Sequence, residues 1–576
     1  MSEFIFGSLS TLEKRVAYVQ ASRRGVQHGS RLRPHTPRPG QSPTIFVTTE
    51  LDQALERVVC TIIQPEKVTI ELQPADITWD LLNWTYMQTW QAVLPAFPAG
   101  TLVRYLVYAH PADGSAPIPA DDGGQFSYLV AVPQLPDWAR EAIVYQIFPD
   151  RFHPGPGRDW QPAKSLNDIH GGTLDGITAH LDYVADLGFN CLWLNPFFPD
   201  DTHHGYHAHD YFQVNPRLGT LDDMRRLVDE AHRRGLRLIL DFVANHWGSK
   251  HATFQAALAD RHSEYHDWYN WIAWPHEYES FFGVQDLPQV NVNHPAARQY
   301  LLKAADFWLR EMGFDGYRLD YALGPSLDFW TEFRAVCKAA RPDAWLFGEV
   351  VETPYIQRRY SGRLDGCLDF GLTQAIRNTF AFGTMRLSAL DALLNLHETF
   401  FPDHFSRPSF LDNHDMNRFL WLVGGDQRKL KLATLLQFTL AGPPVVYYGS
   451  EVGLSQMRDI AHPDGRHLME ESRLPMRWGA AQDKELHHYY RQLIHFRRQH
   501  PVLARGRRQT VHLDDPAGTY AYIRQDDQET VLVALNLSEQ RREINAAGQL
   551  LTLEPWRGDL RLLPAAGVSQ TERLNS

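Results

Sequence analysis

Short apolar runs alternate with longer amphipathic segments through the middle of the chain, from Ala142 to about Leu454. This alternation is typical of repeated βα units, in which a helix follows each buried parallel strand. Two of the longer segments, 221–234 and 297–311, carry apolar residues at three- and four-residue spacing, as amphipathic helices do. Strands are expected at 143–148, 189–194, 236–242, 313–319, 345–348, 364–370, 408–411 and 443–448. Eight such units predict an α/β fold, a (β/α)₈ TIM barrel.

Both ends of the chain follow a two-residue period instead. Runs at 44–48, 58–63 and 102–108 are broken by Pro, Gly and Asp turns, which predicts an N-terminal β-sandwich. Runs at 520–524 and 529–535 predict a C-terminal β-sandwich in the same way. A chain of 576 residues is too long for one hydrophobic core, so three domains are expected.

The expected domains are the N-terminal sandwich at 43–137, the barrel at 138–504 and the C-terminal sandwich at 505–576. Residues 1–42 are expected to form a lead-in or linker, because 22–42 are rich in Arg, Pro, Gly and His. The barrel range includes an inserted excursion at about 247–292, because the gap after the third strand is too long for a simple βα loop.

The composition narrows the class of protein. A net charge of -12 argues against a nucleic-acid partner, because phosphates favour a basic surface. No run approaches the roughly 18 apolar residues of a membrane span. The start of the chain carries Glu13, Lys14 and Arg15 inside its apolar stretch, unlike a secretion signal. The four cysteines lack metal-ligand spacing. We therefore expect a cytoplasmic protein with neither a nucleic-acid nor a membrane partner.

Polar residues follow four of the predicted strands, at the points where the strands end. The segments are 238–246, 316–320, 344–349 and 409–415, and the last three end in Asp320, Glu349 and Asp415. A charged group at the end of a buried strand lies at the rim of the sheet, where a ligand can reach it. Three carboxylic acids at one rim predict a carboxylate-based glycosidase site.

Elementary chemistry gives these acids different tasks. Arg318 lies two residues before Asp320 on the same strand face, so its guanidinium should lower the pKa of Asp320 and keep that group anionic. Glu349 ends a strongly apolar run, so burial should raise its pKa, which suits a general acid. Asp415, beside His414, is suited to hold sugar hydroxyls and stabilise a distorted ring. An Arg-x-Asp pair alone is most often a structural ion pair, so the prediction depends on the joint pattern.

Taken together, the four segments resemble the signatures of the α-amylase family (glycoside hydrolase family thirteen), which read D-x-V-x-N-H, G-x-R-x-D, G-E and x-N-H-D. Here they stand as Asp241-Phe-Val-Ala-Asn-His246, Gly316-Tyr-Arg-Leu-Asp320, Gly348-Glu349 and Asp412-Asn-His-Asp415. Their order and spacing match, and the similarity runs from about residue 144 to 507.

The resemblance implies roles for individual residues. Asp320 would be the nucleophile, Glu349 the acid/base and Asp415 the stabiliser of the transition state. The segment His204-Gly-Tyr206, followed by Asp210, resembles the family's H-G-Y-x-x-x-D, which makes Tyr206 the ring that stacks on the −1 sugar. The expected substrate-binding residues are Tyr206, His204, His246, Arg318, His414 and Asp241.

Segments outside the signatures divide between two subgroups of the family. Residues 144–152, the preceding sandwich and residues 424–431 resemble the cyclomaltodextrinase, neopullulanase and maltogenic amylase group. His204-Gly-Tyr206 and 410–419 resemble cyclodextrin glucanotransferases instead, although Val350-Val351 replaces the aromatic pair that typically follows their acid/base. The sequence leaves the subgroup open.

No cofactor is expected. Related enzymes bind calcium with the Asp of P-D-R-F and of a later G-G-D; here Asp150 remains, but Gly171-Gly-Thr173 replaces the second acid. A hard cation prefers six or more oxygens, so the loss of a carboxylate argues against calcium. Asn245 is interpreted as a residue that hydrogen-bonds its loop rather than as a calcium ligand.

Two groups of aromatic residues keep two interpretations each. Rings in the excursion form a small core or stack on sugar at a cleft wall, and both can hold for different members. Rings in the N-terminal sandwich bind starch or form a packed hydrophobic edge, of which we favour the edge. That sandwich often mediates dimers in the resembled group, so a homodimer through it is one expected partner. The two groups are Phe254, Tyr265, Trp268, Tyr269, Trp271, Trp274, Tyr278, Phe281 and Phe282, and Trp79, Trp84, Tyr86 and Trp90.

Three functions are weighed. The first is a retaining glycosidase that acts on α-1,4-linked glucans, maltooligosaccharides or cyclodextrins, with some transfer to sugar acceptors. The second is a glucanotransferase that forms cyclodextrins from starch. The third, a non-catalytic glucan-binding barrel, would predict the loss of at least one acid, and all three acids are present.

Overall fold

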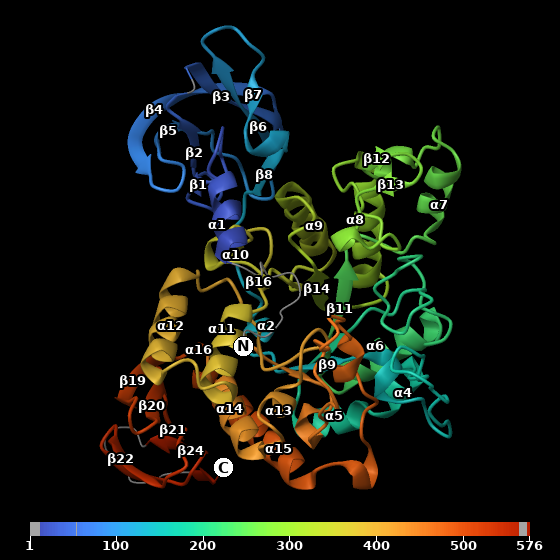
Figure 1. Cartoon of the computed structure of the whole chain (residues 1–576), viewed down its shortest axis with the longest axis vertical. Coiled ribbons are helices and arrows are strands. Elements are labelled where there is room, and N and C mark those ends of the chain that lie inside the picture. The colour runs from blue at the N-terminus through green and yellow to red at the C-terminus, as the bar shows by residue number, and fades with distance from the viewer. Residues whose placement is uncertain (1–11, 53, 564–572, 576) are drawn as a thin grey trace.

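Eight parallel strands form the centre of the molecule and curl into a barrel (Figure 1). A computed structural model describes residues 12–52, 54–563 and 573–575. Neighbours follow the order β16-β15-β14-β11-β10-β9-β18-β17, and a parallel bridge between Gly366 and Ser406 joins the two ends. All eight predicted strands are confirmed, as β9 (Val144–Ile147), β10 (Cys191–Leu194), β11 (Arg237–Val243), β14 (Gly316–Asp320), β15 (Trp345–Gly348), β16 (Gly366–Cys367), β17 (Ser409–Phe410) and β18 (Pro444–Tyr447).

Helices surround this barrel, and the two predicted from periodicity are present. Residues 221–234 contain α6 (Leu221–Arg233), which begins with a capping box between Thr220 and Asp223, and residues 297–311 fall almost wholly within α8 (Pro295–Arg310). The other helices of the barrel are α2 (Asp137–Arg140), α3 (Pro149–Phe152), α4 (Leu174–Ala179), α5 (Leu181–Leu187), α9 (Leu327–Ala340), α10 (Pro354–Arg358), α11 (Phe370–Ile376), α12 (Leu387–Phe400), α13 (Phe419–Leu422), α14 (Gln427–Thr439), α15 (Lys484–Gln499) and α16 (Val502–Arg505). No helix in the described part of the chain is long and apolar enough to cross a membrane.

The predicted excursion rises beside the barrel between β11 and α8 (Figure 1). It contains α7 (Ala252–Ala259) and the short hairpin β12 (Trp271–Ala273) and β13 (Glu277–Tyr278). Phe254, Trp268 and Tyr269 are buried in the same hydrophobic cluster as the barrel strands, so the excursion shares the barrel core instead of building a separate one. Phe282, by contrast, is 56% exposed.

The N-terminal strands form one antiparallel sheet that folds on itself, because the long β4 contributes to both halves. Its core cluster joins Ile45 and Val47 from one half with Val58 and Val107 from the other. The strands are β1 (Leu32–Arg33), β2 (Thr44–Glu50), β3 (Leu55–Gln64), β4 (Val68–Asp80), β5 (Thr85–Val93), β6 (Leu102–Pro111), β7 (Ile118–Pro119) and β8 (Phe126–Leu129).

The prediction of a linker before this sheet is wrong for residues 12–33. They form α1 (Leu12–Ala21) and β1, which pairs with β2. The cause is a long-range contact that local composition cannot reveal: His28 is fully buried, and its ring nitrogens hydrogen-bond the Phe46 carbonyl and the Tyr105 hydroxyl, each at 2.8 Å. Residues 1–11 of the predicted linker lie outside the described residues.

The aromatic residues of the N-terminal sheet divide between core and surface. Trp90 packs against the core cluster and donates its indole N–H to the Thr49 hydroxyl. Trp79, Trp84 and Tyr86 are exposed, and their rings contact one another edge to face at 4.9–5.5 Å from Trp79. Only Trp90 therefore belongs to the packed interior, and the other three rings form a surface cluster.

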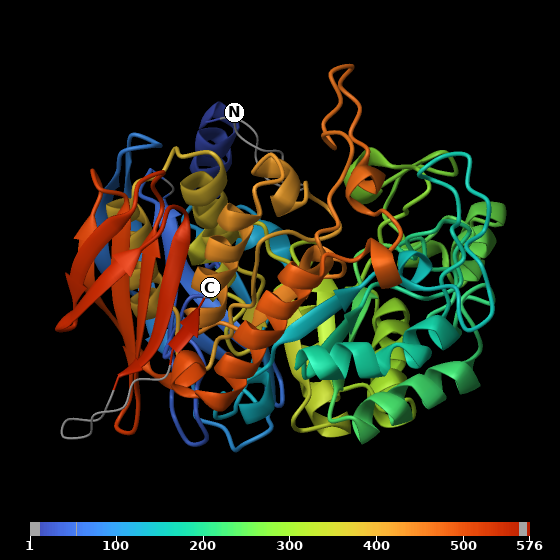
Figure 2. The same cartoon turned by 90° about the horizontal axis from the view of Figure 1, so that it is seen from below.

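A second sandwich closes the C-terminal side of the molecule (Figure 2). One sheet has the order β19-β20-β21-β24-β25, and the hairpin β22-β23 packs on it through a cluster that includes Ile523, Leu532, Ile544 and Leu551. The opposite face of that sheet joins the barrel core through residues such as Tyr522. The strands are β19 (Arg507–Asp514), β20 (Thr519–Gln525), β21 (Thr530–Asn536), β22 (Arg542–Ala546), β23 (Gln549–Leu553), β24 (Arg557–Leu563) and β25 (Arg573–Asn575).

Candidate active site

The register of three neighbouring strands brings the predicted acids together at the carboxyl ends of the barrel. Asp241 of β11 pairs with Arg318 of β14, and Leu319 of β14 pairs with Gly348 of β15. The next residues, Asp320 after Leu319 and Glu349 after Gly348, therefore lie at the same level at the ends of adjacent strands. Their position at the strand ends follows from the fold itself, because parallel barrel strands all finish at one rim.

Arg318 lies at the centre of this group and is completely buried. Its Nη1 donates to Asp241 Oδ1 and to Asp320 Oδ1, both at 2.7 Å, and its Nη2 lies 2.9 Å from Glu349 Oε1. Three carboxyl groups thus share one guanidinium. They cannot all be ionised cheaply in a buried site, because one positive charge balances only one of them.

The pKa values of the three acids follow from this imbalance. Burial raises the pKa of Asp320 to about 7 despite the opposing pull of Arg318, and neighbouring Asp241 and Asp415 add to the rise. Burial likewise raises the pKa of Glu349 to about 7 and that of Asp241 to about 6. The expectation for Glu349 is confirmed. Arg318 lowers the pKa of Asp320 as expected, but the net pKa is raised instead of lowered, because burial outweighs a guanidinium shared among three acids.

Asp415 stands apart from that group in its electrostatics. Burial pushes its pKa up, but His414 and Arg473 pull it further down, so that the net pKa lies well below the usual range. Arg473 Nη2 lies 3.0 Å from Asp415 Oδ1, and His414 Nε2 lies 3.0 Å from Asp415 Oδ2. These two neighbours therefore favour the carboxylate form of Asp415.

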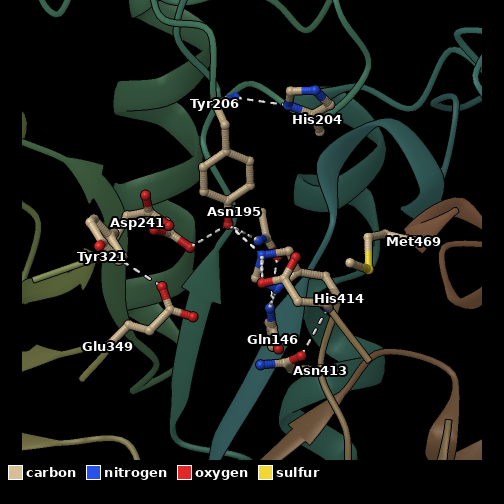
Figure 3. Close-up of polar contacts among 12 residues, drawn as sticks. Gln146, Asn195, His204, Tyr206, Asp241, Tyr321, Glu349, Asn413, His414 and Met469 are labelled. Atoms are coloured by element: carbon tan, nitrogen blue, oxygen red, sulfur yellow. Dashed lines mark hydrogen bonds and ion pairs between the residues drawn. The ribbon is translucent and has the colours of Figure 1, made fainter. Parts of the chain in front are cut away.

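Tyr206 and His414 form a stacked pair over the floor of the site (Figure 3). Their rings are 5.4 Å apart and nearly parallel, and the Tyr206 hydroxyl donates to Asp241 Oδ2 at 2.9 Å. Gln146 Nε2 lies 2.9 Å from His414 Nδ1 and can only donate, so the imidazole proton belongs on Nε2, which faces Asp415 and the Tyr206 hydroxyl. This network fixes both rings.

The two remaining predicted residues lie next to the site and contact none of its carboxylates through a described hydrogen bond. His204 accepts the backbone N–H of Tyr206 at 3.1 Å and so shapes the turn that presents that ring (Figure 3). His246 stacks on Phe281 of the excursion, with ring centres 4.3 Å apart, and burial lowers its pKa to about 3. Both histidines hold loops at the rim in place.

Several residues of the site were missed from the sequence. Gln146 lies inside an apolar strand and Asn195 directly follows the next one, so a search for polar residues in and after strands would have found both. Asn195 donates to the Tyr206 hydroxyl at 2.8 Å, and Trp193 donates to Asp241 Oδ2 at 3.0 Å. Arg473 gave no signal, because it reaches Asp415 from a loop 58 residues away.

The residues that would hold calcium in related enzymes do not fit an ion here. The Asp150 carboxylate pairs with Arg151 and accepts the backbone N–H groups of His170 and Gly171 at 3.0 and 3.1 Å. A cation there would have to displace a guanidinium and two donors. The expectation that the protein needs no cofactor stays a prediction.

The arrangement as a whole can do acid–base and nucleophilic chemistry. Asp320 and Glu349 reach the two terminal nitrogens of one guanidinium, so they face the same small volume, and with pKa values near 7 one can be ionised while the other keeps a proton. Asp415 supplies a negative charge beside them.

Comparisons with known proteins agree with this geometry. Residues 146–483 match the model of the alpha-amylase catalytic domain. "Alpha-amylase 2" of Dictyoglomus thermophilum is 40% identical over 416 residues, which cover 72% of each chain, and a cyclomaltodextrinase of a Bacillus species is 37% identical over 426 residues, which cover 71% of this chain and 74% of that protein. A solved structure of a cyclomaltodextrinase is similar with a TM-score of 0.68 and 29% identity, over 90% of this chain and 92% of that chain.

Proposed function

Because the chain belongs to the α-amylase family, glycoside hydrolase family thirteen, we propose that it is a retaining glycosidase that cleaves α-1,4-glucosidic bonds. The observation that supports this most is the pair of carboxyl groups, Asp320 and Glu349, on one buried guanidinium. Retaining enzymes need two carboxyl groups about 5–5.5 Å apart, one as nucleophile and one as acid/base. A shared arginine keeps two such groups close.

In the first step Glu349 donates its proton to the glycosidic oxygen while Asp320 attacks the anomeric carbon. The bond from carbon to the leaving oxygen breaks, and a covalent glycosyl ester forms on Asp320. In the second step the Glu349 carboxylate takes a proton from the acceptor, whose oxygen attacks the same carbon and frees Asp320. The charge on Asp415 and the Tyr206 ring stabilise the flattened, positively charged sugar in the transition state of each step.

The proposed substrates are starch-type glucans, maltooligosaccharides and cyclodextrins. Support comes from the cyclomaltodextrinases among the similar proteins, which are named for opening cyclic glucans. Water and a sugar hydroxyl compete for one covalent intermediate, so the enzyme is also proposed to transfer sugar to acceptors. The exposed ring of Phe282 in the excursion favours a sugar acceptor at the rim.

A second candidate is a glucanotransferase that makes cyclodextrins from starch. It is supported by the loop that carries His204 and Tyr206, which resembles those enzymes. A homodimer through the N-terminal sandwich and a cytoplasmic location stay part of the proposal. The exposed cluster of Trp79, Trp84 and Tyr86 supports the dimer, because large apolar surfaces mark contact sites.

A product profile over time, with soluble starch and β-cyclodextrin as parallel substrates, tests the proposal. We expect rapid opening of the ring to maltose and glucose, with retained anomeric configuration by NMR, and Asp320→Asn as the inactive blank. New cyclic products from starch with little reducing sugar would favour the glucanotransferase. Equal inertness of wild type and blank on both substrates would reject the substrate class.

A further inference from the structure

Two aromatic residues with left-handed backbones face each other at the edge of the site. Tyr321, directly after Asp320, has a φ of 38°, and Phe282 of the excursion has a φ of 49°. Their rings meet edge to face at 5.3 Å. A bulky residue in this region of backbone space is strained and persists only where its surroundings hold it.

The strained backbone conformation of Tyr321 directs its N–H group toward Glu349. Its N–H donates to Glu349 Oε2 at 3.1 Å, and this contact is drawn in Figure 3. Arg318 Nη2 lies 2.9 Å from the other oxygen, Oε1. The Glu349 carboxyl is thus fixed from both of its oxygens, which sets the direction in which it can deliver a proton.

Rings of the excursion hold Tyr321 from the outside. Phe281 contacts the Tyr321 ring at 5.0 Å and is itself stacked on His246 of the barrel rim at 4.3 Å. Phe282 also contacts the Tyr321 ring, and it packs edge to face on Phe281 at 4.6 Å. The three rings form an aromatic clamp, which we define as Phe281, Phe282 and Tyr321.

The chain after Tyr321 is fastened from the inside. The Ala322 N–H donates to the Glu349 carbonyl at 3.0 Å. The Ala322 carbonyl accepts the Trp330 indole N–H at 2.8 Å and the Tyr360 hydroxyl at 2.9 Å. With Asp320 fixed on Arg318 and Ala322 fixed on these donors, the only adjustable residue between them is Tyr321.

We propose that Tyr321 is a positioning residue that aims the carboxyl of Glu349, and that the aromatic clamp keeps its backbone in the left-handed conformation this requires. The inference rests on the proposed role of Glu349 as general acid. It assigns to the excursion a task in proton delivery, in addition to any contact of its rings with substrate.

How strongly the reaction rate depends on the orientation of the general acid is determined by the leaving group. A sugar alkoxide leaves only when it is protonated, whereas a nitrophenolate leaves without much help. Misaiming Glu349 should therefore slow the cleavage of a natural glucan and spare that of an activated aryl glycoside. A merely structural defect would reduce both rates alike.

The test compares kcat/KM for maltotriose and 4-nitrophenyl α-maltoside in Tyr321→Ala and Phe282→Ala. We expect a loss of about 10- to 100-fold on maltotriose, part of the roughly 10²–10⁴-fold that a general acid supplies, and a much smaller loss on the aryl substrate. Ile272→Ala, another exposed apolar residue of the excursion, is the matched control and should behave as wild type.

Tyr321→Gly separates backbone strain from ring contact. Glycine adopts a positive φ without cost, so this variant should keep more activity on maltotriose than Tyr321→Ala. Equal losses on both substrates, or a glycine variant no better than the alanine one, would overturn the inference. Because Phe282 is 56% exposed, Phe282→Ala will fold even if the variants of Tyr321 do not. Wild-type inertness on both substrates would instead reject the proposed function.

Discussion

Two of the clusters of arginine and carboxylate among the described residues differ in how their charges balance. At the site, Asp241, Asp320 and Glu349 share Arg318. Between the N-terminal sandwich and the barrel, two arginines meet two acids: Arg104 of β6 contacts Asp328 and Glu332 of α9 at 3.0 and 2.5 Å, and Arg298 of α8 contacts the same acids at 2.6 and 3.1 Å.

The difference teaches what each cluster is for. At the domain interface two positive groups face two negative ones, so the charges balance and the ion pairs tie the sandwich to the barrel. The excess of acid at the site forces at least one carboxyl to hold a proton near neutral pH. The same residue types thus connect two domains in one place and hold an exchangeable proton in the other.

The largest expected effect separates activity from stability at the site. Asp320→Asn removes the proposed nucleophile and should lower the rate on maltotriose by about 10³-fold or more. It should not lower the melting temperature, because it also removes one of the three acids that compete for Arg318. Reducing-sugar release and a thermal melt measure both. A variant that keeps a tenth of the activity would contradict the assignment.

At the interface between the N-terminal sandwich and the barrel we expect the reverse, a loss of stability with unchanged activity. Arg298→Met leaves Asp328, which is only 1% exposed, with Arg104 as its single cation and should destabilise the fold by about 2 kcal/mol. The value of kcat at 25 °C should stay that of wild type, since none of the four groups contacts a described residue of the site. Urea denaturation measures the first quantity. An unchanged midpoint would show that the balanced cluster contributes nothing to stability.

The pH dependence of activity should reveal the proton that the acids of the site share. Asp320 works ionised and has a raised pKa of about 7, so activity falls as the pH drops below that value. Glu349 works protonated and also has a raised pKa of about 7, so activity falls as the pH rises above it. The expected profile of kcat/KM is a narrow bell near pH 7.

Asp241→Asn sharpens this test by removing one negative charge beside Asp320. Asp241 raises the pKa of Asp320, so the acid limb of the bell should move to lower pH in the variant. Arg298→Met is the control, and its two limbs should coincide with those of wild type. An acid limb at the same pH as in wild type would mean that the charge of Asp241 does not affect the ionisation of Asp320.

The smallest effect is expected at Glu451, a buried acid outside both clusters. Its Oε1 accepts the hydroxyls of Tyr145 and Tyr183 at 2.8 and 2.7 Å, and burial raises its pKa. An acid with a raised pKa in the folded state costs stability as the pH climbs above its ordinary value. Glu451→Gln should therefore gain stability relative to wild type on going from pH 5 to pH 8, by about 1 kcal/mol. Melts at both pH values measure the difference, and a constant difference would contradict it.

Periodicity was sufficient to predict the barrel strands, because they lie in mostly apolar runs, and it located α6 and α8, whose apolar residues recur at three- and four-residue spacing. Even β16, with only two residues, was located, because it lies within the run predicted at 364–370. The lead-in was misjudged because a buried histidine, His28, holds a segment whose local composition is that of a linker. Sequence reports local preference, and such a contact is not local.

The candidate site could be predicted as far as it follows strand ends. Asp320 and Glu349 were found in this way, and the structure brings them to one guanidinium. The pKa of Asp320 could not be predicted, because it depends on how many acids Arg318 serves. Tyr321 was also beyond prediction, since its backbone conformation is set by rings about 40 residues earlier in the chain.

The way the hydrophobic interior is divided has a consequence for how the molecule can be rearranged. The barrel, the excursion and one face of the C-terminal sheet share one core, while the N-terminal sandwich has its own. The N-terminal sandwich is thus the more separable part of the described chain: its core is its own, and it contributes one charge, that of Arg104, to the cluster that it shares with the barrel. The C-terminal sandwich is not separable in this sense, because cutting it away would open the barrel's interior to water.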